Sequence, residues 1–406
     1  MTDRSPVALP RRRTARSERL GALVVGLAAE GAPAPEVPAD DLDEVVALAV
    51  HHRLPGLAFQ RLRSAVAGAD AAGLAPLSDA YRAASTHNLA QLAQLAQLGP
   101  VLDDADPSWL VVKGPVLAGE AYGDPGLRTA YDLDLVVSPE RFPDVLAALE
   151  AAGGRPRQRN WPLLARLELG QLVVDLPLGG TGDLHWHLVN TPFARRRFAL
   201  DMDELRERRR IVTLDGVRVP TLDPNDTVLH LCLHGSLSGG HLLVWTKDVA
   251  RATTALPVDW DELVRRARRA RLGLVAALQL ERARVVLGAP VDPAVISALA
   301  PRSALVAAWS RADRTWRSPW ARDHRTGKTV STALSATTPA TVVELVRRLP
   351  SEVVGPRLSL LARRPASLPP GQSLLTRPAG GEAAREHYLA FVVAQGATRS
   401  LSSVRR

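Results

Sequence analysis

The chain has 406 residues, an apolar content of 46% and a formal net charge of +9 at pH 7. This length predicts two to three domains and is ample for a buried core. The single cysteine, Cys232, excludes an internal disulfide and a zinc site built from cysteines, and it fits a reducing compartment. No apolar run approaches the ~20 residues that span a membrane.

Much of the positive charge lies near the two ends of the chain. The arginines concerned are Arg11, Arg12, Arg13, Arg16, Arg19, Arg363, Arg364, Arg405 and Arg406. A net positive charge is typical of nucleic-acid-binding proteins, but no aromatic residues alternate with these arginines as they do in a base-stacking surface. We therefore expect solvated tails, and nucleic acid is the less favoured partner.

The amino-terminal quarter of the chain is expected to be helical after a short basic tail. Residues 1–17 are predicted to be disordered and residues 18–100 to form a helical region. The apolar run 20–29 follows basic residues as in a signal peptide, but acidic residues bracket it, which favours an amphipathic first helix. A Leu-Ala-Gln repeat at 89–98 predicts a helix leading into the next region, although its period differs from 3.6.

Residues 101–222 alternate between strand and helix patterns and form the expected core. Strands are predicted at 109–114, at 131–137 and within 163–189, with a helix near 139–152. Together with the helical regions on both sides, this pattern predicts an α+β fold with a small mixed sheet.

A helical domain is expected over residues 223–300, where Asp223 is a good N-cap. The C-terminal region, residues 301–406, is rich in proline, glycine and arginine and is expected to be partly loop, above all at 350–380. Helical character returns only at 382–397.

Two aspartates interrupt the apolar strand pattern at 131–137. Asp132 and Asp134 are two residues apart, so in a strand their side chains point to one face, with Cα atoms roughly 7 Å apart. Burying two unpaired carboxylates costs several kcal/mol, and a divalent cation between them would offset this cost. The alternative is an exposed sheet face, where a D-x-D pattern needs no metal.

Lysine is rare in this chain, since it occurs only at Lys113, Lys247 and Lys328, while arginine is abundant. Lys113 and Gly114 end the apolar run that precedes the D-x-D strand. A compact ammonium on a flexible stem is suited to a phosphate, and glycine lets the backbone approach one. The pair therefore indicates a phosphate-binding turn, with chance retention of a lysine as the alternative.

The stretch K-G-P-V-L-A…Y-G-D-P-G-L-R-T-A-Y-D-L-D-L-V-V, followed by G-D-L-H-W-H-L, resembles the uncharacterised bacterial nucleotidyltransferases of the polymerase-β-like superfamily. An L-K-G strand end, a Tyr, an Arg, a D-h-D-h strand and a downstream D-L-H-W recur there in this order. The similarity is strongest over residues 109–188 and weaker near His51 and over 229–250. The motifs are fairly specific together, and none is diagnostic alone.

The resemblance implies that Asp132 and Asp134 are paired Mg²⁺ ligands, with Mn²⁺ as a substitute. It also implies that Asp183, in D-L-H-W, is the third carboxylate, on a strand beside the first two. Asp175 is the alternative third carboxylate, because it too lies in an apolar strand pattern. Asp183 is favoured because the residues that follow it match the family.

The resemblance further implies a nucleotide-binding role for three residues. Gly114 would border the triphosphate, Lys113 would reach one of its oxygens, and Arg128 would fix either a phosphate or the D-x-D strand. The wider superfamily has Gly-Ser where this chain has Gly114-Pro115. Proline lacks both an N–H group and a hydroxyl, so one phosphate contact is lost there, and we expect Lys113 to replace it.

Three further patterns carry less weight. His230 and His234 share a helix face, as zinc ligands can, but their segment lacks the glutamate of H-E-x-x-H, so packed or substrate-facing histidines are expected. The G-K-T at 327–329 resembles the end of a P-loop without its first glycine. Lys247 and Asp248 are adjacent on a predicted helix and so do not pair with each other; a pocket-lining or packing role is expected.

Together these features predict a magnesium-dependent nucleotidyltransferase of the cytoplasm, where nucleoside triphosphates occur. An acceptor hydroxyl, phosphate or carboxylate would attack the α-phosphorus, and pyrophosphate would leave. ATP is the default donor because it is abundant, and the acceptor would be a small molecule or peptide. The alternatives are a nucleotidyltransferase acting on nucleic acid and a non-catalytic regulatory or binding protein with the same fold.

Overall fold

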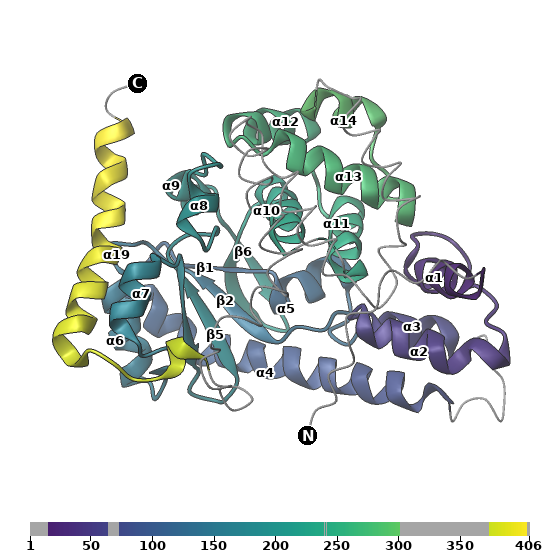
Figure 1. Cartoon of the computed structure of the whole chain (residues 1–406), viewed down its shortest axis with the longest axis horizontal. Coiled ribbons are helices and arrows are strands. Elements are labelled where there is room, and N and C mark those ends of the chain that lie inside the picture. Colours follow the sequence, from purple (N-terminus) through teal and green to yellow (C-terminus); the bar gives the residue numbers. More distant parts are fainter. Residues whose placement is uncertain (1–14, 64–72, 239, 241, 301–372, 404–406) are drawn as a thin grey trace, which may run out of the picture.

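The computed structural model describes residues 15–63, 73–238, 240, 242–300 and 373–403. Within these residues the chain has the predicted α+β fold, in which helices flank a mixed seven-stranded sheet of order β3-β4-β5-β2-β1-β7-β6 (Figure 1). The strands are β1 (Leu110–Val112), β2 (Asp132–Val136), β3 (Arg155–Pro156), β4 (Gln171–Asp175), β5 (Thr181–His185), β6 (Arg210–Leu214) and β7 (Val217–Thr221). Strand β2 pairs antiparallel with β1 and parallel with β5. The strands predicted at 109–114 and 131–137 are thereby confirmed as β1 and β2.

One face of the sheet is apolar and covered by helices. Leu133 and Leu135 of β2 point to this face, because alternate residues of a strand lie on opposite faces, and both are fully buried. The helices packed on this core are α4 (Ala75–Ala105), α6 (Phe142–Ala151), α7 (Trp161–Leu167) and α19 (Gly381–Ser403). Figure 1 shows α19, the yellow C-terminal helix, alongside α6 and α7, where the Tyr388 ring contacts Phe142 and Trp161.

Helix α4 contains the Leu-Ala-Gln repeat, which confirms the helix predicted at 89–98. Leu95 is buried in the core beneath the sheet, and Gln91 and Gln94 of the same repeat are also buried. The Gln94 Oε1 atom accepts a hydrogen bond from the backbone N–H of Leu178, in the turn between β4 and β5. The three-residue period moves round the helix, so the repeat supplies both apolar packing and polar contacts to the sheet.

The other face of β2 carries the aspartates and faces a second layer of helices. Between β1 and β2 lie the short helix α5 (Gly114–Leu117) and the π-helix η3 (Ala118–Tyr122), and α8 (Pro192–Arg195) and α9 (Met202–Glu207) follow β5. The larger helices of this layer are α10 (Pro224–Leu237), α11 (Leu243–Ala255), α12 (Trp260–Arg269), α13 (Gly273–Leu287) and α14 (Pro293–Leu299). The expected N-cap of α10 is confirmed, since the Asp223 carboxylate accepts the backbone N–H of Asp226 at 2.7 Å. Cys232 of α10 is fully buried, which agrees with a structural thiol.

The amino-terminal helices belong to the same layer. They are α1 (Ala15–Ala28), η1 (Ala39–Asp41), α2 (Leu42–His51) and α3 (Pro55–Leu62). A short 3₁₀ turn, η4 (Leu374–Thr376), precedes α19 in the C-terminal region. The buried apolar side chains of α1 to α3 form one continuous cluster with those of α10 to α14. The amino-terminal helices α1 to α3 and the region 223–300, which lie on either side of the sheet region in sequence, therefore share a hydrophobic core.

The amino-terminal tail differs from the expectation at its boundary. Residues 15–17 were expected to be disordered but form the first turn of α1. Arg16 contacts the carboxylates of Asp41 and Glu44, so part of the basic tail is tied to the helices that follow. Residues 1–14 lie outside the described residues.

The C-terminal region is described only from residue 373. Most of the predicted loop at 350–380 and the G-K-T at 327–329 lie outside the described residues. The helix expected at 382–397 is confirmed as α19, which is longer at its C-terminal end. Among the helices described, none combines the length and the apolar character that crossing a membrane requires.

A close backbone approach joins the amino-terminal helices to the loop before β2. A Cβ atom on Gly56 of α3 would overlap the backbone carbonyl of Gly126, whereas a Cβ on Gly99 of α4 would meet no atom within 4 Å. We predict that Gly56→Ala lowers the free energy of unfolding by about 1–3 kcal/mol, the usual cost of overpacking. Gly99→Ala should change it by less than about 1 kcal/mol. Urea denaturation of both variants tests this, and equal stabilities would show that the approach is not tight.

Candidate active site

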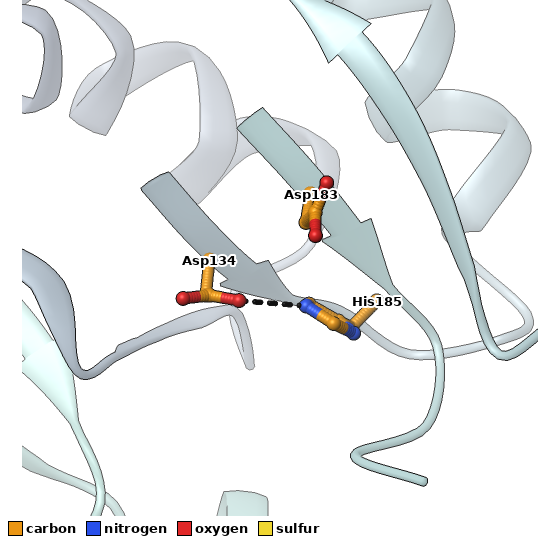
Figure 2. A group of neighbouring side chains, drawn as sticks. All are labelled: Asp134, Asp183 and His185. Atoms are coloured by element: carbon orange, nitrogen blue, oxygen red, sulfur yellow. Dashed lines mark hydrogen bonds and ion pairs between the residues drawn. The ribbon is translucent and has the colours of Figure 1, made fainter. Parts of the chain in front are cut away.

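The strand register brings the acidic residues together on one face of the sheet. Asp134 of β2 lies directly beside Asp183 of β5, and these two strands run parallel. Asp132 and His185 are two residues from Asp134 and Asp183, so all four side chains share this face. Figure 2 shows Asp134 on one strand, with Asp183 and His185 on its neighbour.

Asp134 is the most constrained of these groups. Its carboxylate lies 3.0 Å from the Lys113 Nζ atom on one side and accepts a hydrogen bond from the His185 Nε2 atom at 3.0 Å on the other. Burial alone would raise the pKa of Asp134, but the Lys113 ammonium and the His185 contact together hold it well below its usual value. Asp134 is therefore ionised throughout the physiological pH range.

Asp132 and Asp183 are less well compensated. Burial and then the Asp134 charge raise the pKa of Asp132, and no hydrogen bond to another described residue holds its carboxylate. Burial also raises the pKa of Asp183 to about 6, and the charges of Asp134 and Asp132 add to the effect. The Asp183 carboxylate accepts one hydrogen bond, from the Gln171 Nε2 atom at 2.7 Å. Two of the three carboxylates thus lie in surroundings that disfavour their charge.

The donor atoms fit a divalent cation. One oxygen each of Asp134 and Asp183 and a ring nitrogen of His185 lie within 4.8 Å of one another. Carboxylate oxygens are the ligands that Mg²⁺ and Mn²⁺ take in proteins. Because the charge of Asp134 raises the pKa of both Asp132 and Asp183, a cation placed among them would relieve the repulsion. This group contains Asp134 and Asp183 of the predicted ligands and His185, which was not predicted as a ligand, but it does not contain Asp132.

The turn after β1 carries a backbone conformation that side chains rarely adopt. Lys113 has φ +58° and Gly114 has φ +46°, so two successive residues lie at positive φ. Positive φ is unfavourable for a residue with a side chain and persists where surrounding contacts hold it. Here the ion pair with Asp134 supplies such a contact. Pro115 follows in the first turn of α5, where the missing N–H group has little cost.

Arg128 does not contact the carboxylates of β2 directly. Its Nε and Nη2 atoms donate to both oxygens of Asp248 in α11, at 2.9 and 3.0 Å, and its Nη1 atom donates to the Gly114 carbonyl at 3.4 Å. The Tyr122 hydroxyl donates to the same aspartate at 2.7 Å. This buried network connects the glycine turn to the helical layer.

Asp175, the alternative third carboxylate, is engaged elsewhere. It accepts hydrogen bonds from the side chains of Arg155 and Arg157, at 3.2 and 2.7 Å. On β4, the residue opposite Asp183 is Val173. The geometry therefore places Asp183, and not Asp175, in the acidic cluster.

Several contacts of the site were not foreseen from the sequence. Gln171 comes directly before the apolar strand pattern of Asp175, and the sequence assigned it no role. Tyr122 was recognised only as the tyrosine of the family motif, and no partner was predicted for it. Asp248 had been assigned a pocket-lining or packing role. As expected, Lys247 and Asp248 do not pair: Lys247 donates to Glu30 at 2.6 Å.

His230 and His234 of α10 lie near this face. Their rings are 6.1 Å apart, and burial, followed by the charge of Lys113, lowers the pKa of both. His187 is also buried, and its Nδ1 atom accepts the backbone N–H of Val189. His230 also lines a small pocket together with Lys113.

The structure thus places clustered carboxylates on one face of the sheet and a lysine-glycine turn at the end of β1, an arrangement suited to a phosphorylated substrate and its cation. The chain belongs to the family of uncharacterised nucleotidyltransferases, whose sequence pattern matches residues 38–288. No curated protein and no solved structure matched the chain. The match covers the whole acidic face, so the chain is a nucleotidyltransferase, as its resemblance to this family had implied.

The raised pKa of Asp183 has a consequence for stability. Because the folded-state pKa of about 6 exceeds the usual 3.8, the folded protein holds this proton more tightly, and the contribution to stability is lost as the pH rises from about 4 through 6. We predict that Asp183→Asn raises the free energy of unfolding in EDTA by on the order of 2 kcal/mol at pH 7.5 and by almost nothing at pH 4.

The matched control is Asp175→Asn. It removes a carboxylate that two arginines hold, so it should give no gain at either pH. Chemical denaturation at the two pH values measures both effects, and an equal gain for Asp183→Asn at pH 4 and pH 7.5 would contradict the electrostatic explanation.

Proposed function

We propose that the protein is a magnesium-dependent nucleotidyltransferase that moves a nucleoside monophosphate from a nucleoside triphosphate to a small-molecule or peptide acceptor. The observation that carries this proposal is the gathering of three carboxylates on one sheet face, two of them with raised pKa. ATP is the expected donor because of its abundance, and Mn²⁺ is expected to replace Mg²⁺. The supply of nucleotides favours a cytoplasmic location.

In this proposal Asp132, Asp134 and Asp183 hold the cation. When bound, a divalent cation neutralises the charge of the triphosphate and of the leaving pyrophosphate. His185 fixes the orientation of the Asp134 carboxylate through its hydrogen bond, as outer residues of metal sites commonly do. The partly compensated Asp183 positions the attacking group and takes up its proton.

The Lys113–Gly114 turn is assigned to the triphosphate. Gly114 has no side chain, and a Cβ there would lie 3.4 Å from the Gln91 Oε1 atom, so its absence leaves room for a phosphate oxygen. Lys113 is mostly buried beside Asp134, and its flexible stem would allow the ammonium to reach a phosphate oxygen if a bound cation compensated that aspartate. Arg128 holds the Gly114 carbonyl and so maintains the turn.

The reaction forms one bond and breaks one bond at the α-phosphorus. An acceptor oxygen attacks in line, the bond from the α-phosphorus to the bridging oxygen breaks, and pyrophosphate leaves with the electron pair. Asp183 receives the acceptor proton. Positioning and charge neutralisation supply most of the rate enhancement in such transfers.

Asp132→Asn tests the carboxylate assignment. We predict a loss of transfer of more than about 100-fold, since even changes outside the ligand shell cost 10- to 100-fold. The melting temperature should stay equal or rise, because burial and Asp134 disfavour the charge of Asp132. Labelling of a cell extract with [α-³²P]ATP and Mn²⁺ binding followed by electron paramagnetic resonance are the measurements. Asp144→Asn, on the exposed surface of α6, is the control. Retained Mn²⁺ binding with retained transfer would reject the metal site.

Lys113→Arg tests the phosphate assignment. Arginine keeps the charge but replaces a point charge on a flexible stem with a planar fork. We predict that the Kd for the magnesium complex of α,β-methylene-ATP rises about tenfold, the loss of roughly one charged hydrogen bond. Arg82→Lys, at a site that is 70% exposed, is the control for the exchange of the two cations. Isothermal titration calorimetry gives the Kd, and an unchanged Kd would contradict the assignment of Lys113 to phosphate binding.

A further inference from the structure

A cleft lies between α9, α10 and α12, beside the acidic face. Its empty volume is about 660 Å³, and part of this space is open to solvent. Leu188, three residues after His185, forms part of the wall, together with Leu205 of α9. The cleft therefore adjoins the end of the strand that carries Asp183 and His185.

The charged groups of the cleft wall neutralise one another. Four arginines face four carboxylates, with Asp201 included among the latter. The four arginines and their partners are Arg208 with Asp226, Arg266 with Asp226, Arg265 with Glu262 and Arg269 with Glu204. Asp201 caps α9 by accepting the backbone N–H groups of Asp203 and Glu204. Because every cation already has an acidic partner, the wall offers no spare charge to a strongly anionic ligand.

His230 is the exception in this wall. Its side chain is 8% exposed, and neither ring nitrogen has a hydrogen-bond partner among the described residues. Both the donor and the acceptor of a neutral imidazole are thus unused, although buried polar groups are normally hydrogen-bonded. The remainder of the inner wall is apolar and includes Leu229, Leu233 and Leu272.

His230 also faces the catalytic side. It lines a second, smaller pocket together with Lys113 and Thr221, so the imidazole separates the cleft from the lysine turn. Burial lowers the pKa of His230 to about 3, and the Lys113 charge adds to this effect. The ring is consequently neutral at physiological pH and can both accept and donate a hydrogen bond.

We propose that the cleft between α9, α10 and α12 binds the acceptor, and that the acceptor has an apolar body and a hydroxyl group that hydrogen-bonds to His230. The leucines contact the apolar body, and the imidazole directs the hydroxyl towards the Lys113 side, where the nucleotide is expected. This inference rests on the proposed nucleotidyl transfer, and it adds the chemical class of the acceptor.

Stability separates this role from a structural one. If His230 were needed for folding, replacing it would lower the melting temperature. Since its nitrogens lack partners, His230→Leu removes an unsatisfied polar group, and we expect an equal or higher melting temperature. His387→Asn, on an exposed position of α19, is the matched control for a histidine exchange.

The first experiment measures binding directly, without the transfer reaction. Protein labelled with ¹⁵N-histidine is titrated with 1-hexanol, hexanoate or hexylamine, and the His230 ring signals are those missing from His230→Asn. We expect the largest shift with 1-hexanol. No shift with any of the three probes, or a larger shift with hexanoate or hexylamine, would overturn the proposal.

The second experiment measures transfer to acceptors in an extract of the source cells with [α-³²P]ATP. His230→Leu should reduce labelling about tenfold or more, the loss of roughly one hydrogen bond to the reacting group, while its Kd for magnesium α,β-methylene-ATP stays within about twofold. Wild-type labelling by His230→Leu, or a joint loss of nucleotide binding and melting temperature, would overturn the acceptor role. If the wild-type protein labels nothing, the proposed function fails, and the hexanol titration alone decides whether the cleft binds a hydroxyl.

Discussion

The buried carboxylate of Asp134 is the point on which the geometry of the site depends. It is held between the Lys113 ammonium and the His185 imidazole, and so it joins the end of β1 to the two central strands. A buried carboxylate without partners is strongly unfavourable, which explains why the unusual backbone at Lys113 persists. One ammonium cannot neutralise three neighbouring carboxylates, so the face remains short of positive charge. A divalent cation bound among these carboxylates would supply the missing positive charge.

A second buried network connects this face to the helical layer. Arg128 links the Gly114 carbonyl to Asp248 of α11, and Tyr122 shares the same carboxylate. The amino-terminal helices and α10 to α14 have one common core, so the turn after β1 is held by a layer that combines segments before and after the sheet region in sequence. The cleft next to His230 lies on the α9, α10 and α12 side of this layer, and in the proposed reaction the acceptor and the nucleotide would lie on opposite sides of His230.

The parts of the site that follow from local spacing were predictable, and those that depend on tertiary contacts were not. The i, i+2 spacing of Asp132 and Asp134 fixes their common face in any strand. The assignment of Asp183 to the site came from the resemblance to a family, because spacing alone did not distinguish Asp183 from Asp175 as the third carboxylate. Gln171 and Asp248 were missed because their partners are 12 and 120 residues away, and no local pattern encodes such a register. The predicted disordered tail included residues 15–17, which belong to α1, because Arg16 meets its acidic partners only when α1 lies beside the start of α2.

Helix α19 lies beyond residues 38–288, the segment that defines the family, yet it packs on the catalytic sheet layer. Tyr388 and Val392 are completely buried there among side chains of α6 and α7. A fragment trimmed to the family segment would therefore expose an aromatic strip around Phe142 and Trp161 to water, and such strips promote self-association. Recombinant expression of this enzyme is accordingly best designed around the full chain, because its solubility is determined partly by a helix that family boundaries would remove.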